Sequence, residues 1–176
     1  DGSLDWEQEV TVSTNASQID GSQVWLKENE VRTVRELFTA MSVYSANDAT
    51  VALAEEIAGD ETAFVNMMNE KAEAMGLKDT HFRNSTGLPQ DMYPDPPQVD
   101  GKHLMSAKDS ATLAQYLIRD YPEITEFTTI DKETFREGET GEINMINWNR
   151  MIPGLEHEYD GVDGLKTGET EAAGAC

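Results

Sequence analysis

Residues 33–76 read TVRELFTAMSVYSANDATVALAEEIAGDETAFVNMMNEKAEAMG, and this stretch predicts a helical body. Its first four residues, Thr-Val-Arg-Glu, have the pattern of a capping box, so a helix is expected to begin there. After a break at residues 45–47, an apolar stripe predicts a second helix that stops at Gly59. Asp60 is expected to cap a third helix that runs to Gly76.

The rest of the chain adds one helix and several short strands. Ser106 begins a second capping-box pattern, and the helix that follows must end before Pro122. Residues 89–103 contain four prolines and are expected to form a surface loop. The expected strands are residues 10–12, residues 24–26, a hairpin that pairs Phe135 with residues 143–146, and a late strand at residues 161–168. A helical body with strands at its edges predicts an α+β fold.

Composition restricts the classes of function. The 176 residues include 13 Lys and Arg against 34 Asp and Glu, for a net charge of −21. Such a surface repels phosphate backbones and anionic lipids, which argues against nucleic-acid binding and against a membrane surface as partner. The acid excess indicates either adaptation to high salt or an ordinary acidic, soluble protein. The chain is expected to form one domain, 1–176, and no apolar run approaches the roughly 18 residues of a membrane span.

Metal and cofactor sites find no support in the sequence. The histidines His81, His103 and His157 lie far apart and match neither an HExxH nor a His-x-x-x-His spacing. The aspartates of the proline-rich loop lack the spacing of a calcium loop, and no glycine-rich phosphate loop is present. We therefore expect no metal and no cofactor. The only cysteine, Cys176, leaves the redox compartment open.

Two short motifs could carry chemistry. Ser45-Ala46-Asn47 lies in the break between two helices, and Lys166-Thr167-Gly168 lies on the expected late strand. A lysine amine near a serine hydroxyl can assist proton transfer, and an asparagine amide can hold an amide substrate. A strand edge ending in Thr-Gly can bind a peptide carboxylate and carbonyl. The structural alternatives are that Asn47 caps the second helix and that Lys166 is an exposed strand lysine.

Longer stretches around these motifs carry a family resemblance. They are residues 44–49 (YSANDA), 52–55 (ALAE), Phe64, 68–69 (MN), 81–88 (HFRNSTGL), 147–149 (NWN), 161–170 (GVDGLKTGET) and 173–174 (AG). In this order they resemble the low-molecular-mass penicillin-binding proteins that are serine-type D-alanyl-D-alanine carboxypeptidases, in their Bacillus-type branch. The resemblance implies a helical subdomain and edge strands of a DD-peptidase/β-lactamase-like transpeptidase fold, incomplete at both ends.

The chain departs from the family at its nucleophile. No Ser-x-x-Lys tetrad occurs in the 176 residues. In the family this tetrad precedes the part that resembles residues 2–12, and the carboxy-terminal β-domain and membrane anchor would follow Cys176. The resemblance therefore implies the central part of the enzyme, inactive alone, attached to a membrane only through an anchor outside this chain. The implied location is extracytoplasmic, in the bacterial cell envelope.

The resemblance also implies a role for each matching residue. The enzyme would remove the terminal D-Ala from peptidoglycan pentapeptide stems through an acyl-enzyme, and β-lactams would acylate it as substrate mimics. Ser45 would pass a proton to the departing D-Ala nitrogen, Asn47 would hydrogen-bond the substrate amide, and Lys166 would supply positive potential. The implied substrate-binding residues are Lys166, Thr167, Gly168, the backbone N–H of Glu169 in the oxyanion hole, and Asn149, for which a structural role is equally open.

Three alternatives remain open on the sequence. A class A β-lactamase would need a general-base Glu, and none stands in a recognisable motif. A non-catalytic protein that binds cell-wall peptide would also lack the Ser-x-x-Lys tetrad. The last alternative is a helical domain in which the two triplets occur by chance.

Overall fold

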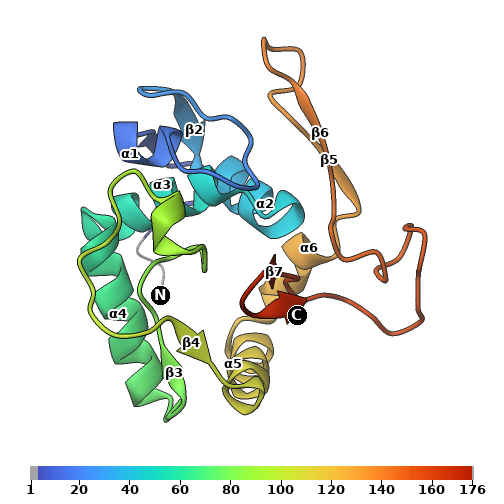
Figure 1. Ribbon diagram of the computed structural model, residues 1–176. Helices are drawn as coiled ribbons and strands as arrows, with labels where there is room; N and C mark the ends of the chain where they lie inside the picture. Colours follow the sequence, from blue (N-terminus) through green and yellow to red (C-terminus); the bar gives the residue numbers. More distant parts are fainter. Residues whose placement is uncertain (1–3, 176) are drawn as a thin grey trace.

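The structure is a computed structural model that describes residues 4–175. Three consecutive helices form its body: α2 (Val34–Tyr44), α3 (Asn47–Ala58) and α4 (Glu61–Ala74), as Figure 1 shows. The predicted capping box is present at the start of α2, where the Thr33 hydroxyl accepts from the Glu36 N–H and the Glu36 carboxylate accepts from the Thr33 N–H. The Asp60 side chain caps α4 in the predicted way. The three helices are therefore confirmed.

The core is built where α2 and α3 pack against each other. Their buried faces bring apolar side chains together with the segment that precedes α2 and with one hairpin beyond the helices. Burial of this apolar surface is the main stabilising contribution to the fold. The fully buried members include Val10, Val12, Ile19, Val24, Leu37, Ala40, Val43, Ala49, Val51 and Met145.

The remaining helices are shorter or peripheral. Helix α5 begins after Ser106, whose hydroxyl accepts from the Asp109 N–H, and it ends before Pro122, both as predicted. Within residues 4–175, the helices outside the body are α1 (Thr14–Ser17), α5 (Ala107–Asp120), α6 (Thr125–Thr128) and the 3-10 turns η1 (Gln90–Met92) and η2 (Pro122–Ile124).

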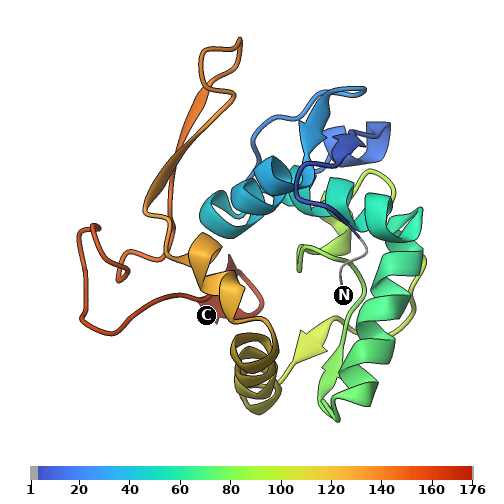
Figure 2. The same cartoon turned by 180° about the vertical axis from the view of Figure 1, so that it is seen from behind.

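All the sheets formed by residues 4–175 are antiparallel pairs of two strands. They are β1 (Glu9–Thr11) with β2 (Val31–Thr33), β3 (Thr80–His81) with β4 (Leu104–Met105), β5 (Lys132–Phe135) with β6 (Ile143–Ile146), and β7 (Glu169–Thr170) with β8 (Gly174–Ala175). The predicted hairpin is thus confirmed in β5–β6, which projects away from the helical body in both views (Figures 1 and 2). Helices with small sheets at their edges confirm the α+β class.

Two predicted strands are wrong. Residues 24–26 form no strand, because the Val24 and Leu26 N–H groups donate to the buried carboxylate of Asp48 instead of to a neighbouring strand. Residues 161–168 form no strand either, and β7 begins only at Glu169. Gly161 and Gly164 have positive φ angles, and no segment within residues 4–175 pairs with 161–168. A strand needs such a partner for its backbone groups.

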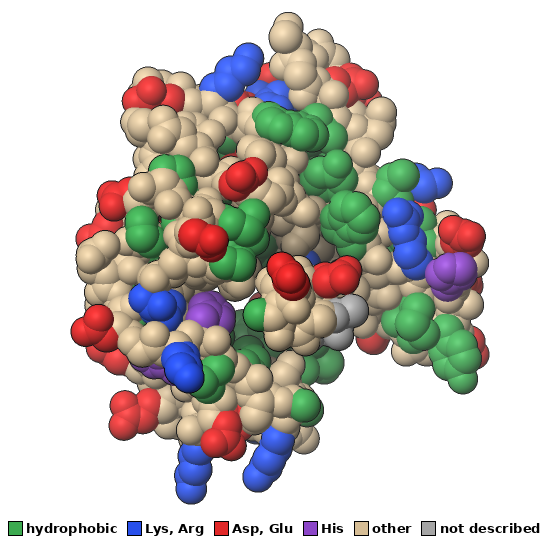
Figure 3. All heavy atoms as spheres, in the orientation of Figure 1, with side chains coloured by type: hydrophobic (Ala, Val, Ile, Leu, Met, Phe, Trp, Pro, Cys, Tyr) green, Lys and Arg blue, Asp and Glu red, His purple; other side chains and the backbone are tan. Residues whose placement is uncertain are grey.

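The surface reflects the acidic composition. Asp and Glu side chains are scattered over the face in Figure 3 and do not gather into one patch. In the part of the chain that the structure describes, no helix combines the length and the apolar character needed to cross a membrane. Cys176 lies outside the described residues.

Candidate active site

Ser45 lies at the junction of the two central helices. It ends α2 in the left-handed conformation, with φ 60° and ψ 34°, and α3 begins two residues later. A non-glycine residue in this conformation is uncommon and often marks a functional position. The junction leaves the Ser45 hydroxyl partly accessible at the surface, since the residue is only half-buried.

Lys166 reaches the same point from the far end of the sequence. Its Nζ donates a hydrogen bond of 2.8 Å to Ser45 Oγ and a second one to the Thr167 carbonyl oxygen. The structure therefore brings together the two motif residues that lie 121 positions apart. The amine can exchange a proton with the hydroxyl at this distance.

Burial lowers the pKa of the Lys166 amine below its usual value. The Lys166 side chain as a whole is exposed. Its amine, however, lies against Ser45 and the Thr167 carbonyl and has lost part of its hydration there. No ion pair joins Lys166 to a carboxylate within residues 4–175, so no opposite charge there offsets the loss of hydration. A lowered pKa means that less free energy is needed to move a proton off the amine.

Asn47 is buried at the start of α3 and is not the cap of that helix. The N-cap position is Ala46, which makes no side-chain cap bond. Asn47 Nδ2 instead donates to the Asp20 carbonyl oxygen at 3.0 Å, and its backbone N–H donates to the Ser22 carbonyl at 2.8 Å. The Asn47 amide therefore ties the loop before α2 to the serine junction, and the capping interpretation was wrong.

Asn149 lies beside the segment that carries Lys166. Its Nδ2 donates to the Gly164 carbonyl oxygen at 3.2 Å. Two neighbours that the sequence analysis did not select extend this contact. Asn147 Oδ1 accepts from the Asn149 N–H at 2.8 Å, and Trp148 Nε1 donates to the Tyr44 carbonyl oxygen at 3.0 Å. The Asn-x-Asn spacing was the only local signal for them.

The three residues after Lys166 continue away from it toward β7. Thr167 is half-buried, and Gly168 is exposed with no atom within 4 Å of the position that a Cβ would occupy. Glu169 begins β7 with an exposed side chain and pairs with Ala175. This stretch therefore offers an open edge of backbone next to the amine.

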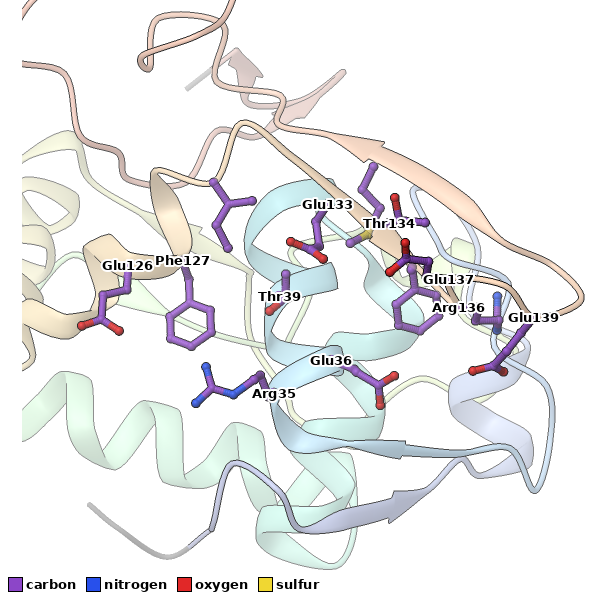
Figure 4. A pocket seen from close by; sticks show the side chains of 13 residues that line it. Arg35, Glu36, Thr39, Glu126, Phe127, Glu133, Thr134, Arg136, Glu137 and Glu139 are labelled. Carbon is purple, nitrogen blue, oxygen red and sulfur yellow. The ribbon is translucent and has the colours of Figure 1, made fainter.

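The described residues also enclose two cavities that lie apart from this site. One, of about 520 Å³, is bounded by α2, α6 and the β5–β6 hairpin, with Thr39, Phe127 and Glu133 among its lining residues (Figure 4). The other, of about 540 Å³, lies beside the start of α4. Neither is lined by Ser45 or Lys166. No cluster of three or more possible metal ligands occurs in the described part of the chain.

Comparison with known families decides the class of protein. Residues 1–176 match the peptidase S11 family, described as D-alanyl-D-alanine carboxypeptidase. The chain belongs to this family. This S11 chain is 38% identical over 175 residues to the D-alanyl-D-alanine carboxypeptidase DacF of Bacillus subtilis, covering 99% of the chain and 41% of DacF. It is also 38% identical over 156 residues to DacD of Escherichia coli, covering 89% of the chain and 36% of DacD.

Solved structures agree with this assignment. The S11 chain superposes on the peptidoglycan synthesis regulatory factor PBP3 of Streptococcus pneumoniae with a TM-score of 0.88 and 35% identity, over 99% of this chain and 49% of that one. The ampicillin-bound penicillin-binding protein D2 of Listeria monocytogenes gives a TM-score of 0.75 and 28% identity, over 98% of this chain and 63% of that one. The chain spans about two fifths of the length of these curated relatives. The resemblance to low-molecular-mass penicillin-binding proteins is therefore confirmed.

Proposed function

We propose that this S11 chain supplies the Ser-x-Asn and Lys-Thr-Gly elements of a serine D-alanyl-D-alanine carboxypeptidase. The substrate is the pentapeptide stem of peptidoglycan, and the nucleophile is a serine of a Ser-x-x-Lys segment outside these 176 residues. The observation that carries the proposal is the 2.8 Å bond from Lys166 Nζ to Ser45 Oγ, within a chain whose whole length matches the family.

Ser45 and Lys166 act on the proton of the leaving group. The nucleophilic serine gives its proton to the lysine of the same Ser-x-x-Lys tetrad, its oxygen attacks the carbonyl carbon of the penultimate D-Ala, and the peptide C–N bond breaks. The departing nitrogen takes a proton through Ser45 Oγ, which Lys166 holds in place and keeps polarised. Water then cleaves the acyl ester, which releases the shortened stem and restores the serine hydroxyl.

The residues around them bind the substrate. The Lys166 charge and the Thr167 hydroxyl attract the terminal carboxylate, and the open face of Gly168 lets the peptide lie against the backbone. The Glu169 N–H stabilises the developing oxyanion. Asn47 accepts from the substrate amide through its Oδ1, because its Nδ2 already donates to the Asp20 carbonyl. Asn149 contributes by supporting the Lys166 segment.

β-Lactam binding and a place in the cell envelope follow from the proposed activity. β-Lactams place a reactive carbonyl and a carboxylate where the stem peptide would, and the Listeria relative was solved with ampicillin bound. Peptidoglycan lies outside the cytoplasmic membrane, so the enzyme works in the cell envelope, attached to the membrane only through an anchor outside this chain. It needs no cofactor, no metal and no nucleic-acid partner, because serine acyl transfer proceeds without them.

The test is acylation by a penicillin. A protein that contains this chain together with its Ser-x-x-Lys segment is incubated with benzylpenicillin and followed by intact mass and peptide mapping. We expect an adduct on the serine of that tetrad. Lys166→Ala should slow its formation by about 100-fold or more, the range of general acid–base contributions. Lys27→Ala, which removes an exposed lysine, is the matched control and should leave the rate unchanged.

A second candidate is a non-catalytic protein that binds cell-wall peptide. Such a protein would also lack a Ser-x-x-Lys tetrad, and the 176 residues contain none. A folded protein that forms no adduct, yet binds a D-Ala-D-Ala stem peptide in calorimetry, would replace the carboxypeptidase proposal with this one.

A further inference from the structure

The contact between Ser45 and Lys166 needs a support that neither residue supplies. Ser45 ends a helix, whereas Lys166 lies in residues 161–168, which pair with no strand in the described part of the chain. An unpaired segment with two glycines of positive φ has little rigidity of its own. A 2.8 Å hydrogen bond to such a segment would be short-lived without further contacts.

Trp148 fixes the Ser45 end of this contact. Its indole N–H donates to the Tyr44 carbonyl oxygen at 3.0 Å, and its ring lies 6.1 Å from the Tyr44 ring, centroid to centroid. The last carbonyls of a helix have no partner within that helix, so this bond satisfies one of them. The Tyr44 carbonyl and the Ser45 N–H belong to one rigid peptide unit. Trp148 therefore holds the carbonyl side of the plane through which the backbone enters Ser45, while the Ser45 N–H donates to the Ala40 carbonyl on the other side.

Asn149 fixes the Lys166 end. Its Nδ2 bonds the Gly164 carbonyl, two residues before Lys166, at 3.2 Å. The adjacent residue on this segment is also anchored, because the Thr128 hydroxyl donates to the Asp163 carbonyl at 2.9 Å. Two successive carbonyls are thus held in place.

Asn147 anchors its neighbours Trp148 and Asn149 to the body of the protein. It is 97% buried, since its relative exposure is 3%. Its Nδ2 donates to the Thr128 carbonyl at 3.2 Å and to the Ile130 carbonyl at 3.0 Å, while its Oδ1 holds the Asn149 N–H. Three consecutive side chains therefore connect the body, the serine junction and the lysine segment.

We propose that Asn147, Trp148 and Asn149 form a clamp that holds the Ser45 hydroxyl against the Lys166 amine, with Trp148 as the positioning residue at the serine end. The effect on catalysis rests on the carboxypeptidase function proposed above. Trp148 is 49% exposed, so its ring is not part of the buried core. Its contacts include the bond to the Tyr44 carbonyl, the Tyr44 ring and the Arg150 guanidinium, which lies 6.0 Å from the centre of its ring.

The test separates the bond from the ring. Trp148→Phe keeps an aromatic ring on Tyr44 and removes the N–H donor. In the protein that includes the Ser-x-x-Lys segment, we expect penicillin acylation to slow about tenfold, the effect of losing one hydrogen bond, with the thermal midpoint nearly unchanged. Trp25→Phe, at a tryptophan that is 57% exposed, is the matched control and should change neither quantity.

A second readout needs no activity. The pH dependence of Lys166 modification by an amine reagent, followed by peptide mass spectrometry, reports the pKa of this amine. When the clamp is broken, the Lys166 amine should lose its contact with Ser45 and become hydrated again. The pKa read from its modification should then move toward the usual value of 10.5. Asn149→Ala, at the other end of the clamp, should shift the profile in the same direction.

The outcomes are distinguishable. Wild-type acylation and an unshifted Lys166 profile in both variants would overturn the clamp. If the wild-type protein forms no penicillin adduct, the carboxypeptidase proposal fails, but the Lys166 profile still decides the clamp. If Trp148→Phe lowers the thermal midpoint strongly and leaves the profile unshifted, Trp148 is structural and the positioning role is rejected.

Discussion

At the residue scale, the Lys166 amine and the Glu169 carboxylate carry opposite charges on the same short stretch of chain. Glu169 follows Lys166 by three positions, and its side chain is exposed at the start of β7. In the proposed mechanism only the Glu169 backbone N–H is used. Its carboxylate therefore adds negative potential where a carboxylate substrate must bind, in a chain that already carries a net charge of −21.

Glu169→Gln should leave the affinity for the stem peptide equal or improve it. The variant keeps the backbone and the side-chain length and removes one repulsive charge. Steady-state kinetics or calorimetry with a D-Ala-D-Ala peptide measures the effect, with Glu171→Gln as the control next to β7. A clear loss of affinity in Glu169→Gln would mean that this carboxylate takes part in binding.

The residues of the site were predictable to different degrees. Ser45 and Lys166 stand in short motifs whose order along the chain was informative, and the structure places them in contact. Trp148 was not selected because its partner, the carbonyl of Tyr44, lies 104 residues away, and the Asn-x-Asn spacing around it does not indicate that contact. The structural alternative for Asn47 was an N-cap of the second helix, because Asn is common at N-cap positions. Its amide instead donates to the Asp20 carbonyl.

At the element scale, Asp48 organises a segment that contains no regular structure. Its carboxylate has no exposure, and it accepts from the N–H groups of Val24, Leu26 and Ala49. Burial raises the pKa of Asp48, while these backbone hydrogen bonds oppose the rise. One side chain thus satisfies donors that a neighbouring strand would otherwise have to satisfy.

Asp48→Asn should destabilise the protein by about 1–3 kcal/mol, the cost of leaving a buried donor unsatisfied. The amide group must turn N–H atoms toward backbone N–H groups, so at least one bond is lost. Chemical denaturation measures the free energy of unfolding, and hydrogen exchange should increase first at Val24 and Leu26. Asp95→Asn, on the exposed proline-rich loop, is the control and should change little. Unchanged exchange at these two residues would contradict this role.

Helices were easier to predict than strands, and Asp48 illustrates the reason. The starts of α2 and α4 depend on side chains within three residues of Thr33 and Asp60, so the local sequence contains the information. Residues 24–26 have the composition of a strand, but whether they form one depends on a distant partner. Here the partner of residues 24–26 is the Asp48 carboxylate and not a second strand, so the strand prediction was wrong.

At the scale of the whole molecule, Arg136 connects the projecting hairpin to the loop before β2. Its guanidinium makes two bonds to the Glu30 carboxylate, at 2.7 and 2.8 Å, and further bonds to the Val24 and Trp25 carbonyls. Arg32 donates to the same carboxylate. Arg136 and Glu30 are nearly buried, so removal of Glu30 leaves the Arg136 charge without its carboxylate partner.

Glu30 should make stability depend on acid pH. Burial alone would raise its pKa, but hydrogen bonds from Arg136, the Lys27 backbone and Arg32 lower it from 4.5 to about 2. Its folded-state pKa lies below the unfolded one, so its stabilising contribution is complete above pH 4.5 and is lost as the pH falls toward about 2.

Thermal midpoints of wild type and Glu30→Gln, measured across this range, test the linkage. The difference between the two proteins should be largest above pH 4.5 and shrink as the pH falls toward about 2. Glu9→Gln, on the exposed edge of β1, should show no such convergence. A difference that stays constant with pH would rule out a lowered pKa at Glu30.

Long-range order was accessible from the sequence only through the family. The resemblance implied an α+β transpeptidase fold, and the family match and the superposed relatives confirm it. Composition and periodicity alone did not indicate that the hairpin would be held by Arg136, because that contact spans 106 residues. The interpretation of the acid excess as salt adaptation stays a prediction.

The left-handed backbone at Ser45 also restricts which hydroxyl-bearing residue can occupy this position. Threonine carries the same functional group, and a protein chemist would count Ser to Thr as the mildest exchange at a proton-transferring position. At φ 60°, however, a β-branched side chain is strained against its own backbone. Natural variation at this position should therefore exclude threonine for conformational reasons, even though its chemistry would suffice.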